Sequence, residues 1–205
     1  VFIIRHKDNH TPHFIAAELN TNSSIINAGD GINQHPSQTL IDLMTIQQYK
    51  QRLSSLTVAI IGDIRHSRVA HSFLEAADIL QLGQINLIGP SAFLPENLNY
   101  SLPITLYTDI NDGLAGADVV MALRIQSERM NQQELPDTAT YINQFTLTQD
   151  RMQHAKNDAI ILHPGPVVRG MEIDSVTADS DQSKILQQIK NSTPVRMAIL
   201  DMLLD

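Results

Sequence analysis

Short apolar runs alternate along this chain with longer stretches in which apolar residues recur at helical spacing. The runs lie at 58–61, 85–88, 104–107, 119–123 and 160–162. A strand needs nearly continuous apolarity when helices cover both faces of its sheet. The pattern therefore predicts an α/β fold with parallel sheets, helices on both faces and right-handed crossovers.

The chain also begins with an apolar run, Val1 to Ile4. Four consecutive apolar residues at a frayed end would be exposed to solvent, so this run predicts a further buried strand. We therefore expect the sequence to start in the middle of a fold.

Helices are expected between the runs. Thr11 and Thr193 each precede a proline and are placed to cap a helix, and Ser67 is placed to cap a helix that runs to about Gln81, with Gly83 just past its end. A longer helix, from about 36 to 51, is predicted to link two parts of the chain.

Two later stretches are less regular. From about 181 to 204 the pattern is helical again, with a break expected near 191–194. Between 125 and 143 the periodicity is weak and polar residues are frequent, which predicts a long loop of the kind that often carries function.

Composition and charge exclude several functions. Lys and Arg number 14 against 22 Asp and Glu, a net charge of −8, which argues against nucleic acid or an anionic membrane surface as the main partner. The chain has no Cys, which excludes disulfides and Cys-ligated metal and suits a cytoplasmic protein. No apolar run reaches the roughly 18 residues of a membrane span. Any anion site must therefore be local.

Neither a metal nor a cofactor is expected. His6, His10 and His13 are close in sequence, but His10 and His13 lie on either side of the expected cap at Thr11 and no acidic partner is indicated. Gly62-Asp63 follows a strand, yet the chain has no G-x-G-x-x-G, P-loop or G-x-S-x-G motif.

Residues 27–38, NAGDGINQHPSQ, form a glycine-rich turn between a strand and a helix. Glycines allow a tight turn, and the amides at a helix start can face an anion or a developing oxyanion. His35 could donate to a carbonyl oxygen, and Gln38, one turn on, faces the same way. By itself, the segment could equally be an ordinary capped turn.

Several basic residues stand at expected element ends. Arg5 ends the first strand, Arg68 lies in the first turn of a helix, and Arg124 and Gln126 follow the strand 119–123. Strand ends are where open α/β sheets present ligands, and a cation near a helix start is unfavourable unless an anion is also bound. Arginine pairs well with carboxylates and phosphates, although solvated strand ends also carry it.

The segment His163-Pro164-Gly165-Pro166 follows another strand. Its prolines lack amide donors and stiffen the turn, so it offers carbonyl oxygens to a ligand. A purely structural turn is the alternative interpretation, and His163 is expected to be structural rather than catalytic.

Four segments together resemble the transcarbamoylase family and, within it, the catalytic chains of aspartate carbamoyltransferases. Residues 27–45, NAGDGINQHPSQTLIDLMT, resemble the central motif of that family, and the other segments follow in the family's order at 61–72, 121–130 and 162–173. The resemblance spans the whole chain. It implies a two-domain architecture whose first domain is incomplete, lacking roughly the first hundred residues, the size of a small domain.

This resemblance divides the chain into three parts. Residues 1–49 would be a remnant of a carbamoyl phosphate-binding domain with a crossover helix, and 50–182 an aspartate-binding domain. Residues 183–205 would be a helical segment that packs back on the first domain.

The activity that the resemblance implies is transfer of a carbamoyl group from carbamoyl phosphate to the amine of L-aspartate. The products are N-carbamoyl-L-aspartate and phosphate, in de novo pyrimidine biosynthesis, and no cofactor takes part. Arg5, His35 and Gln38 would be catalytic. These three residues would hold carbamoyl phosphate together with Pro164 and Gly165, and aspartate would be held by Arg68, Arg124 and Gln126. A loop carrying Glu128 and Arg129 could close over aspartate.

The resemblance also implies partners and shows departures. The family forms homotrimers with shared active sites, and some members bind regulatory or dihydroorotase chains. The family's Ser-Thr-Arg-Thr-Arg motif, and its mobile loop with Ser and Lys, are not found in these 205 residues. We therefore expect this chain alone to be nearly inactive.

Two alternatives compete with this interpretation. One is a non-catalytic binding or assembly module that keeps the fold. The other is an ornithine transcarbamoylase, which is disfavoured because that relative typically has a Cys in its His-x-x-Pro turn, whereas this chain offers Arg124-Ile125-Gln126 to a carboxylate.

Overall fold

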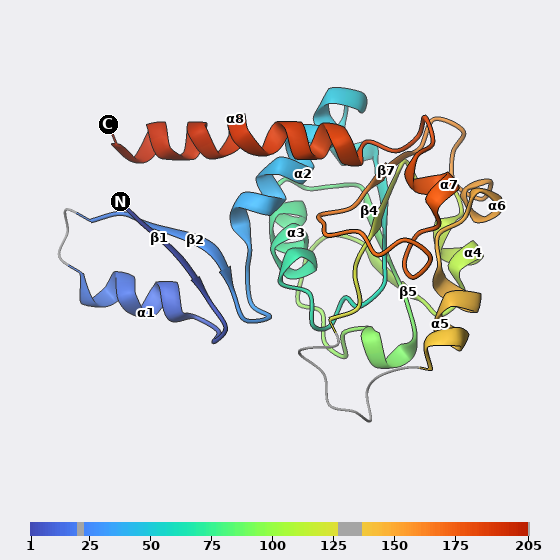
Figure 1. Cartoon of the computed structure of the whole chain (residues 1–205), viewed down its shortest axis with the longest axis horizontal. Helices are drawn as coiled ribbons and strands as arrows, with labels where there is room; N and C mark the ends of the chain where they lie inside the picture. The colour runs from blue at the N-terminus through green and yellow to red at the C-terminus, as the bar shows by residue number, and fades with distance from the viewer. Residues whose placement is uncertain (20–22, 127–136, 205) are drawn as a thin grey trace.

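The structure is a computed structural model that describes residues 1–19, 23–126 and 137–204. A small unit with a two-stranded sheet lies at one end of the elongated molecule and a larger unit with a five-stranded sheet at the other (Figure 1). Two helices, α2 (Pro36–Tyr49) and α8 (Ile185–Leu204), pack along each other and join the two units.

The five-stranded sheet is parallel throughout, with strand order β5-β4-β3-β6-β7. Each predicted run forms one of its strands. The strands are β3 (Thr57–Ile61), β4 (Gln84–Ile88), β5 (Ile104–Tyr107), β6 (Val119–Ala122) and β7 (Ile160–Leu162). The order reverses between β3 and β6, and ligands bind beyond the carboxyl ends of parallel strands at such a switch point.

Helices cover both faces of this sheet, which confirms the predicted fold class. One apolar core joins alternate sheet residues such as Val58 and Val119 to α2 and to α3 (Arg68–Ile79). A second core lies on the opposite face, where Ala59 and Val120 point. Its helices are α4 (Ile110–Leu114), α5 (Thr138–Phe145), α6 (Gln149–Met152), α7 (Ser175–Ala178) and the start of α8. Two 3-10 turns complete the unit, Leu53–Ser55 and Ser91–Phe93.

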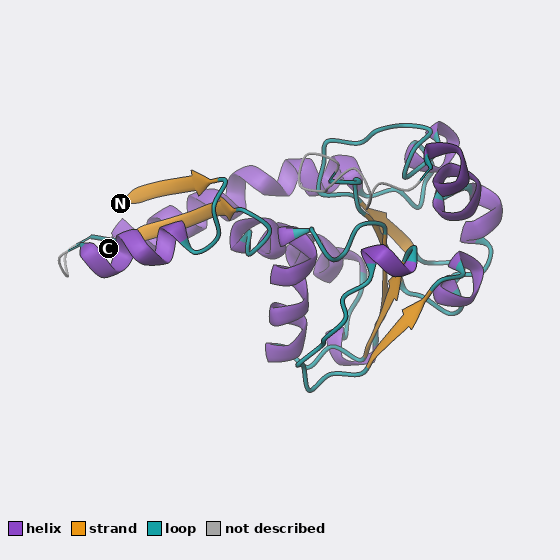
Figure 2. Ribbon diagram, turned by 90° about the horizontal axis from the view of Figure 1, so that it is seen from below, coloured by secondary structure: helices purple, strands orange, loops and turns teal. Residues whose placement is uncertain are grey.

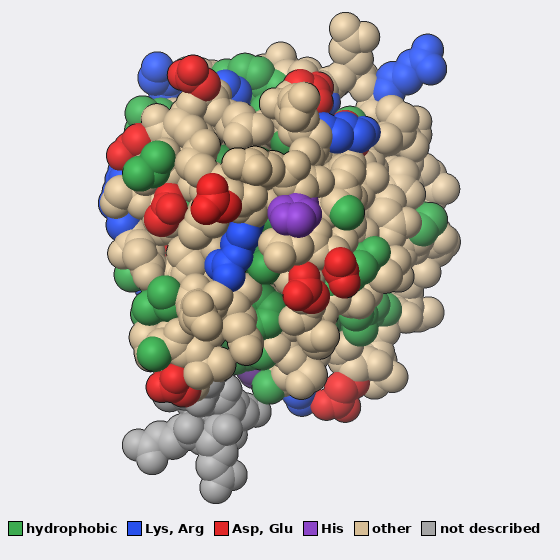
Figure 3. Space-filling model, turned by 90° about the vertical axis from the view of Figure 1, so that its right-hand side faces the viewer, with side chains coloured by type: hydrophobic (Ala, Val, Ile, Leu, Met, Phe, Trp, Pro, Cys, Tyr) green, Lys and Arg blue, Asp and Glu red, His purple; other side chains and the backbone are tan. Residues whose placement is uncertain are grey.

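Because both apolar cores of this unit are covered by helices, few apolar side chains should gather on its surface. On the face that Figure 3 shows, apolar side chains form small, separate patches among polar and charged ones. Acidic and basic groups are interspersed there, so this view shows no broad basic surface that would suit nucleic acid.

The small unit consists of β1 (Phe2–His6), α1 (Thr11–Glu18) and β2 (Ile25–Asp30), with β1 and β2 parallel. The expected strand at the start of the chain is therefore present, but the expectation that it is buried is wrong. Phe2 is 52% and Ile3 63% exposed. Two strands and one short helix provide no second layer of side chains over this face.

The expected break in the last helix is also wrong, because α8 continues through Pro194. Figure 1 draws α8 as one coil, and Figure 2 shows the C-terminal end of the chain beside the two-stranded sheet. Proline removes one backbone hydrogen bond. Buried Asn191 and Val195 on either side anchor the helix, and Asn191 donates to Thr45 of α2 at 2.9 Å. Tertiary packing therefore outweighs the local cost of the proline. Farther on, Ile199 and Leu200 lie beside Ile3 and Ile26 of the two-stranded sheet.

Three smaller expectations need correction. The N-cap position of helix α1 is His10, not Thr11, and its side chain forms no cap hydrogen bond. His10 has a φ of 61°, and its backbone N–H donates to Asp30 at 2.7 Å. Helix α3 begins after Ser67 as predicted, but it ends at Ile79, and the positive φ beyond it belongs to Gln81 (54°) and not to a glycine. The expected loop 125–143 contains the start of α5, capped by Asp137.

Candidate functional site

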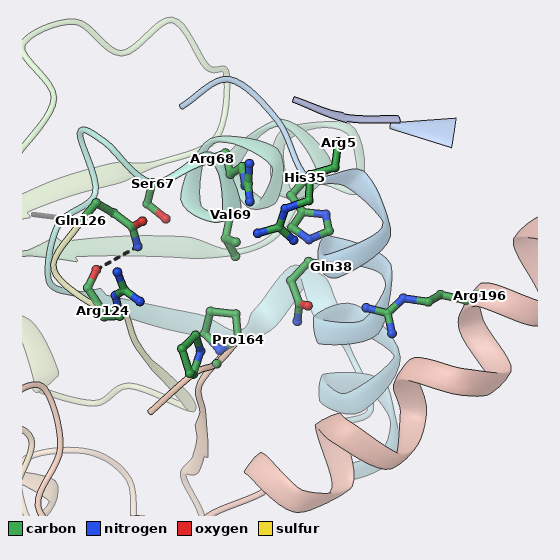
Figure 4. A pocket seen from close by; sticks show the side chains of 12 residues that line it. Arg5, His35, Gln38, Ser67, Arg68, Val69, Arg124, Gln126, Pro164 and Arg196 are labelled. Atoms are coloured by element: carbon green, nitrogen blue, oxygen red, sulfur yellow. Dashed lines mark hydrogen bonds between the residues drawn. The ribbon is translucent and has the colours of Figure 1, made fainter. Parts of the chain in front are cut away.

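A cavity of about 290 Å³ opens beside the amino-terminal ends of α2 and α3, beyond the carboxyl ends of β6 and β7 (Figure 4). All eight residues expected to bind substrate line it, although they come from five separate parts of the chain. The lining comprises Arg5, His35, Gln38, Ser67, Arg68, Val69, Arg124, Gln126, Pro164, Gly165, Pro166 and Arg196.

The turn that leads into α2 is organised by the buried carboxylate of Asp30. The side chains of Asn27 and Asn33 donate to it at 2.9 Å each, and the backbone N–H groups of His10 and Gln34 donate at 2.7 and 3.0 Å. Burial alone would raise the pKa of Asp30, but these four donors together hold it below its usual value. An ionised Asp30 thus fixes the path of the chain just before His35.

Gly29 in the same turn lets Arg68 approach the backbone. Gly29 has a φ of 114°, and a Cβ placed there would lie 2.7 Å from Cζ of Arg68. Any side chain would therefore both strain the backbone and collide with the guanidinium. The glycine is needed at this position for a close contact as well as for a turn.

Arg68 is the first residue of α3, and its side chain is buried. Ser67 caps the helix by accepting from the N–H of Ala70 at 3.2 Å. The dipole of α3 and the amides of its first turn favour an anion at this end, so a buried guanidinium beside them creates a strongly positive position.

Helix α3 also holds the turn of the small unit. The His35 N–H donates to Oγ of Ser72 at 2.7 Å. Nδ1 of His71 donates to the Ile32 carbonyl at 2.7 Å, which places a proton on that nitrogen. Gln34 donates to Glu75 at 2.5 Å. One face of α3 therefore supports the His35 backbone while its first residue contributes the arginine.

The imidazole of His35 is surrounded by positive charge. Burial, followed by the charges of Arg68, Arg5 and Arg196, lowers the pKa of His35 to about 4. The ring is therefore neutral near pH 7, with one N–H donor and one acceptor nitrogen. The neutral ring can donate to a carbonyl oxygen through its single N–H.

On the opposite wall, the His163–Pro166 turn is held from inside the protein. The buried His163 pairs through Nε2 with Oε1 of Glu172 at 2.9 Å, and its Nδ1 accepts from the Gly165 N–H, also at 2.9 Å. Because Pro164 and Pro166 have no N–H, carbonyl oxygens are the polar backbone groups that the turn offers to a ligand. His163 thus has a structural position.

The segment after β6 is positioned by the buried Asp63. One oxygen of Asp63 lies 2.8 Å from Nδ1 of His66, and the other accepts from the Gln126 N–H at 3.2 Å. Burial raises the pKa of Asp63, while these hydrogen bonds oppose the rise. The Gln126 side chain donates to the Arg124 carbonyl at 3.2 Å, the contact drawn in Figure 4. Both side chains line the same wall of the cavity.

Sequence reasoning missed Arg196, whose guanidinium reaches toward Gln38 from α8 (Figure 4). Its position depends on α8 continuing past Pro194, where a break was expected. Glu128 and Arg129, considered as a possible closing loop, lie outside the described residues.

The remaining candidates do not form a site of their own. Within the described residues, no three His, Cys, Asp or Glu side chains are grouped so that they could hold a metal ion. In the same part of the chain, no helix has the length and apolarity needed to cross a membrane.

Comparisons with known proteins give the family to which the chain belongs. Residues 54–203 match the sequence model of the Asp/Orn binding domain of aspartate/ornithine carbamoyltransferases, and residues 1–48 match that of their carbamoyl-P binding domain. The catalytic subunit of aspartate carbamoyltransferase from Vesicomyosocius okutanii is 47% identical over 99% of this chain, and that from Legionella pneumophila is 45% identical over 99%.

The chain spans 63% of the first of these relatives and 67% of the second. Aspartate transcarbamoylase from Trypanosoma cruzi, solved in complex with N-(phosphonacetyl)-L-aspartic acid, has a similar structure. The TM-score is 0.81 at 28% identity, covering 97% of this chain and 64% of that one. The family models together cover nearly the whole chain, so the protein belongs to the aspartate/ornithine carbamoyltransferase family.

Proposed function

We propose that the cavity binds carbamoyl phosphate and L-aspartate side by side, and that the protein transfers the carbamoyl group to the aspartate amine. The reaction yields N-carbamoyl-L-aspartate and phosphate and serves pyrimidine biosynthesis. The observation that carries the proposal is the convergence of four arginines on one cavity in a protein whose net charge is −8. A dianionic phosphate and two carboxylates need such a local cluster.

The lining divides into two ends. Arg5 and His35 come from the small unit and are assigned to carbamoyl phosphate, with Gln38 and the carbonyl oxygens of Pro164 and Gly165. Arg68, Arg124 and Gln126 come from the five-stranded unit and are assigned to the aspartate carboxylates. The choice of these two substrates is supported by the relatives' names and by the related Trypanosoma cruzi structures with carbamoyl phosphate and with aspartate and phosphate. The division of the residues between them is part of the proposal.

In this mechanism the neutral aspartate amine attacks the carbamoyl carbon. The carbamoyl oxygen becomes negative in the tetrahedral intermediate, and the N–H of His35 donates to it. The bond to the phosphate oxygen then breaks, and the departing phosphate takes the amine proton. Orienting two bound reactants can supply roughly 7 to 11 kcal/mol of the barrier, so no covalent nucleophile is required.

The neutral state of His35 suits this role. The amide nitrogen of the carbamoyl group can only donate hydrogen bonds, and Gln38 with the proline turn supplies acceptors. The carbamoyl oxygen can only accept, and His35 supplies a donor. The lining thus distinguishes the two ends of the carbamoyl group by hydrogen-bond polarity.

We also propose the division of the chain into 1–49, 50–182 and 183–205, a cytoplasmic location, and assembly as a homotrimer with shared active sites. Contact with regulatory or dihydroorotase chains belongs to the same proposal. Its support is the family to which the chain belongs, and the two family models, which meet between 48 and 54.

The proposal is tested by titrating the purified chain with carbamoyl phosphate and then with succinate, which carries the two carboxylates of aspartate without its amine. We expect succinate to bind more tightly once carbamoyl phosphate is present, and ornithine not to bind. Arg124→Ala, which leaves the phosphate end intact, serves as the control and should lose succinate binding alone. If neither carbamoyl phosphate nor succinate binds, the proposal is contradicted and a non-catalytic module is favoured.

Turnover is a separate expectation. We expect residues 1–205 alone to form little N-carbamoyl-L-aspartate. The Ser-Thr-Arg-Thr-Arg motif of the family is not found in them, and Arg5, His35 and Arg196 are few donors for a dianionic phosphate. Substantial product from the purified chain with both substrates would contradict that expectation without affecting the assignment of the site.

A further inference from the structure

Asp42 lies on α2 one turn after Gln38 and is fully buried. Its Oδ1 accepts from Nε2 of Gln38 at 2.8 Å and from Nε2 of Gln188, on α8, at 2.6 Å. Within the described residues, its Oδ2 is buried without a hydrogen-bond partner. A carboxyl group in such a place needs an explanation, because burying it without full pairing is costly.

The orientation of both glutamine amides follows from one fixed donor. The backbone N–H of His163 can only donate, and it donates to Oε1 of Gln188 at 3.0 Å. Nε2 of Gln188 must then point toward Asp42, so Oδ1 of Asp42 is an acceptor. Gln38 meets that same oxygen and must also present its Nε2. This holds whether Asp42 is ionised or carries a proton on Oδ2.

The consequence reaches the cavity. The bond to Asp42 engages one N–H of the Gln38 amide and fixes its orientation, which leaves the carbonyl oxygen as the acceptor that the side chain offers to a ligand. Gln188 also ties the backbone of His163, immediately before Pro164, to the same carboxyl. Both groups assigned to accept from the carbamoyl amide are therefore connected to one buried oxygen.

We propose that Asp42 is a positioning residue that holds the Gln38 amide with its oxygen toward the cavity, so that the site accepts a carbamoyl NH2. The proposal rests on the proposed function, since it assigns the carbamoyl end of that same site. Asp42 does not touch substrate. It prevents rotation of the Gln38 amide about its last side-chain bond. In the rotated amide the NH2 of Gln38 would face the carbamoyl NH2, and two donors cannot form a hydrogen bond.

Burial supports a role beyond packing. It raises the pKa of Asp42 to about 7, and the hydrogen bonds from Gln38 and Gln188 only partly offset it. A leucine would fill similar space without that cost, but it would leave the amide N–H groups of Gln38 and Gln188 without their acceptor. An acidic residue at this position is consistent with selection for an acceptor.

The test compares Asp42→Leu, which has the same branching but no acceptor, with Asp42→Asn, which keeps an oxygen that can accept from both glutamines. The readout is the ratio of the dissociation constants of inorganic phosphate and carbamoyl phosphate, measured by calorimetry on the full chain. Phosphate binding reports that each variant is folded. A general loss of structure would weaken both ligands together and leave the ratio unchanged.

We expect Asp42→Leu to lower the preference for carbamoyl phosphate about tenfold, as befits loss of one well-placed hydrogen bond. Phosphate affinity should stay the same, and Asp42→Asn should stay within about threefold of the wild type on the same scale. The side-chain NH2 signals of Gln38 in ¹⁵N NMR should lose their protection from exchange only in Asp42→Leu. If Asp42→Leu does not bind phosphate, Asp42→Ala takes the place of that variant in the comparison, because it removes the acceptor without adding bulk.

Each outcome is decisive. An unchanged ratio in an Asp42→Leu variant that binds phosphate as tightly as the wild type would overturn the positioning role while leaving the proposed function intact. An equal loss in Asp42→Asn would overturn it too, because charge and not amide orientation would then be responsible. A wild-type chain without preference for carbamoyl phosphate over phosphate would contradict the proposed function itself.

Discussion

The two walls of the cavity are built in different ways. The wall that carries Arg124 and Gln126 follows a strand whose residues are fully buried between helices on both faces of a five-stranded sheet. The wall that carries Arg5 follows a strand of a two-stranded sheet, where Phe2 and Ile3 are more than half exposed. Two similar apolar runs thus support an arginine differently. The run before Arg124 is a buried strand, whereas the run before Arg5 is a largely exposed one.

The wall that carries Arg124 and Gln126, the proposed carboxylate end, therefore has its own buried scaffold, whereas the wall that carries Arg5, the proposed phosphate end, depends on neighbouring elements. Strand β1 contributes no residue to either apolar core. The turn before His35 is instead held by the Asp30 hydrogen bonds and by the side chains of α3. Local stability should therefore differ strongly between the two ends.

Hydrogen exchange should show this contrast as the largest effect. Backbone amides of β3 and β6 should exchange at least about a thousandfold more slowly than those of β1, because their opening requires global unfolding. The measurement is native-state exchange followed by mass spectrometry. Equal protection in β1 and β6 would contradict the comparison.

Acidification should destabilise the fold through His35. Its folded-state pKa of about 4 lies below the ordinary value of 6.5. Between these values the His35 side chain binds more protons in the unfolded chain than in the folded one, so its contribution to stability increases with pH across this window and is lost as pH falls from 6.5 to 4. The loss amounts to about 3 kcal/mol at most for a shift of this size.

Asp42, whose pKa burial raises to about 7, contributes the opposite slope over the same window, because there the folded chain binds the extra proton. The His35 contribution is therefore the difference between the wild type and His35→Gln in urea unfolding at pH 6.5 and 4, and the variant should lose less stability on acidification than the wild type. The ring signals of His35 in NMR should titrate near 4 in the free protein, and phosphate should raise that value. A titration near 6.5 without ligand would show that neither burial nor the neighbouring arginines lower the pKa of His35.

Two arginine variants should separate the ends of the cavity. Arg124→Ala should weaken succinate binding by about 2 kcal/mol, the usual size of a charge-assisted contact, and leave phosphate unaffected. Arg5→Ala should do the reverse. Isothermal calorimetry with each ligand measures both, and equal losses for both ligands in either variant would show that the two ends are not distinct.

Gly29→Ala should produce the smallest effect, about 1 kcal/mol of stability from a positive φ together with weaker binding as Arg68 is displaced. Gly116→Ala is the matched control, since Gly116 also has a positive φ (69°) but nothing lies within 4 Å of its added Cβ. Both variants should lose similar stability, and Gly29→Ala alone should lose succinate affinity. If both bind like the wild type, close contact with Arg68 is not required.

Much of the fold could be predicted because its signals are local. The buried strands are short apolar runs, Ser67 caps α3 as its type suggests, and Arg124 lies at a strand end beside the switch point. Strand ends indicate where ligands bind in a parallel sheet. The full set of residues expected to share one cavity came from the family resemblance, because Arg5 belongs to a different sheet from Arg124.

The rest depends on contacts between distant segments. Asp42 and Asp63 are indistinguishable in sequence from exposed carboxylates, and their partners Gln188 and Gln126 lie far along the chain. Arg196 reaches the cavity because α8 remains helical through Pro194, against its local preference. The exposure of β1 likewise depends on which layers are present and not on its own residues.

If one cavity binds the two acids side by side, as we propose, a single ligand that joins them should bind more tightly than either acid. Calorimetry on the wild-type chain would compare N-(phosphonacetyl)-L-aspartate with inorganic phosphate and with succinate, each alone. Because the second contact becomes intramolecular, the joined ligand should bind at least about a hundredfold more tightly than the better of its parts. Binding no tighter than that part would show that the two ends do not form one site.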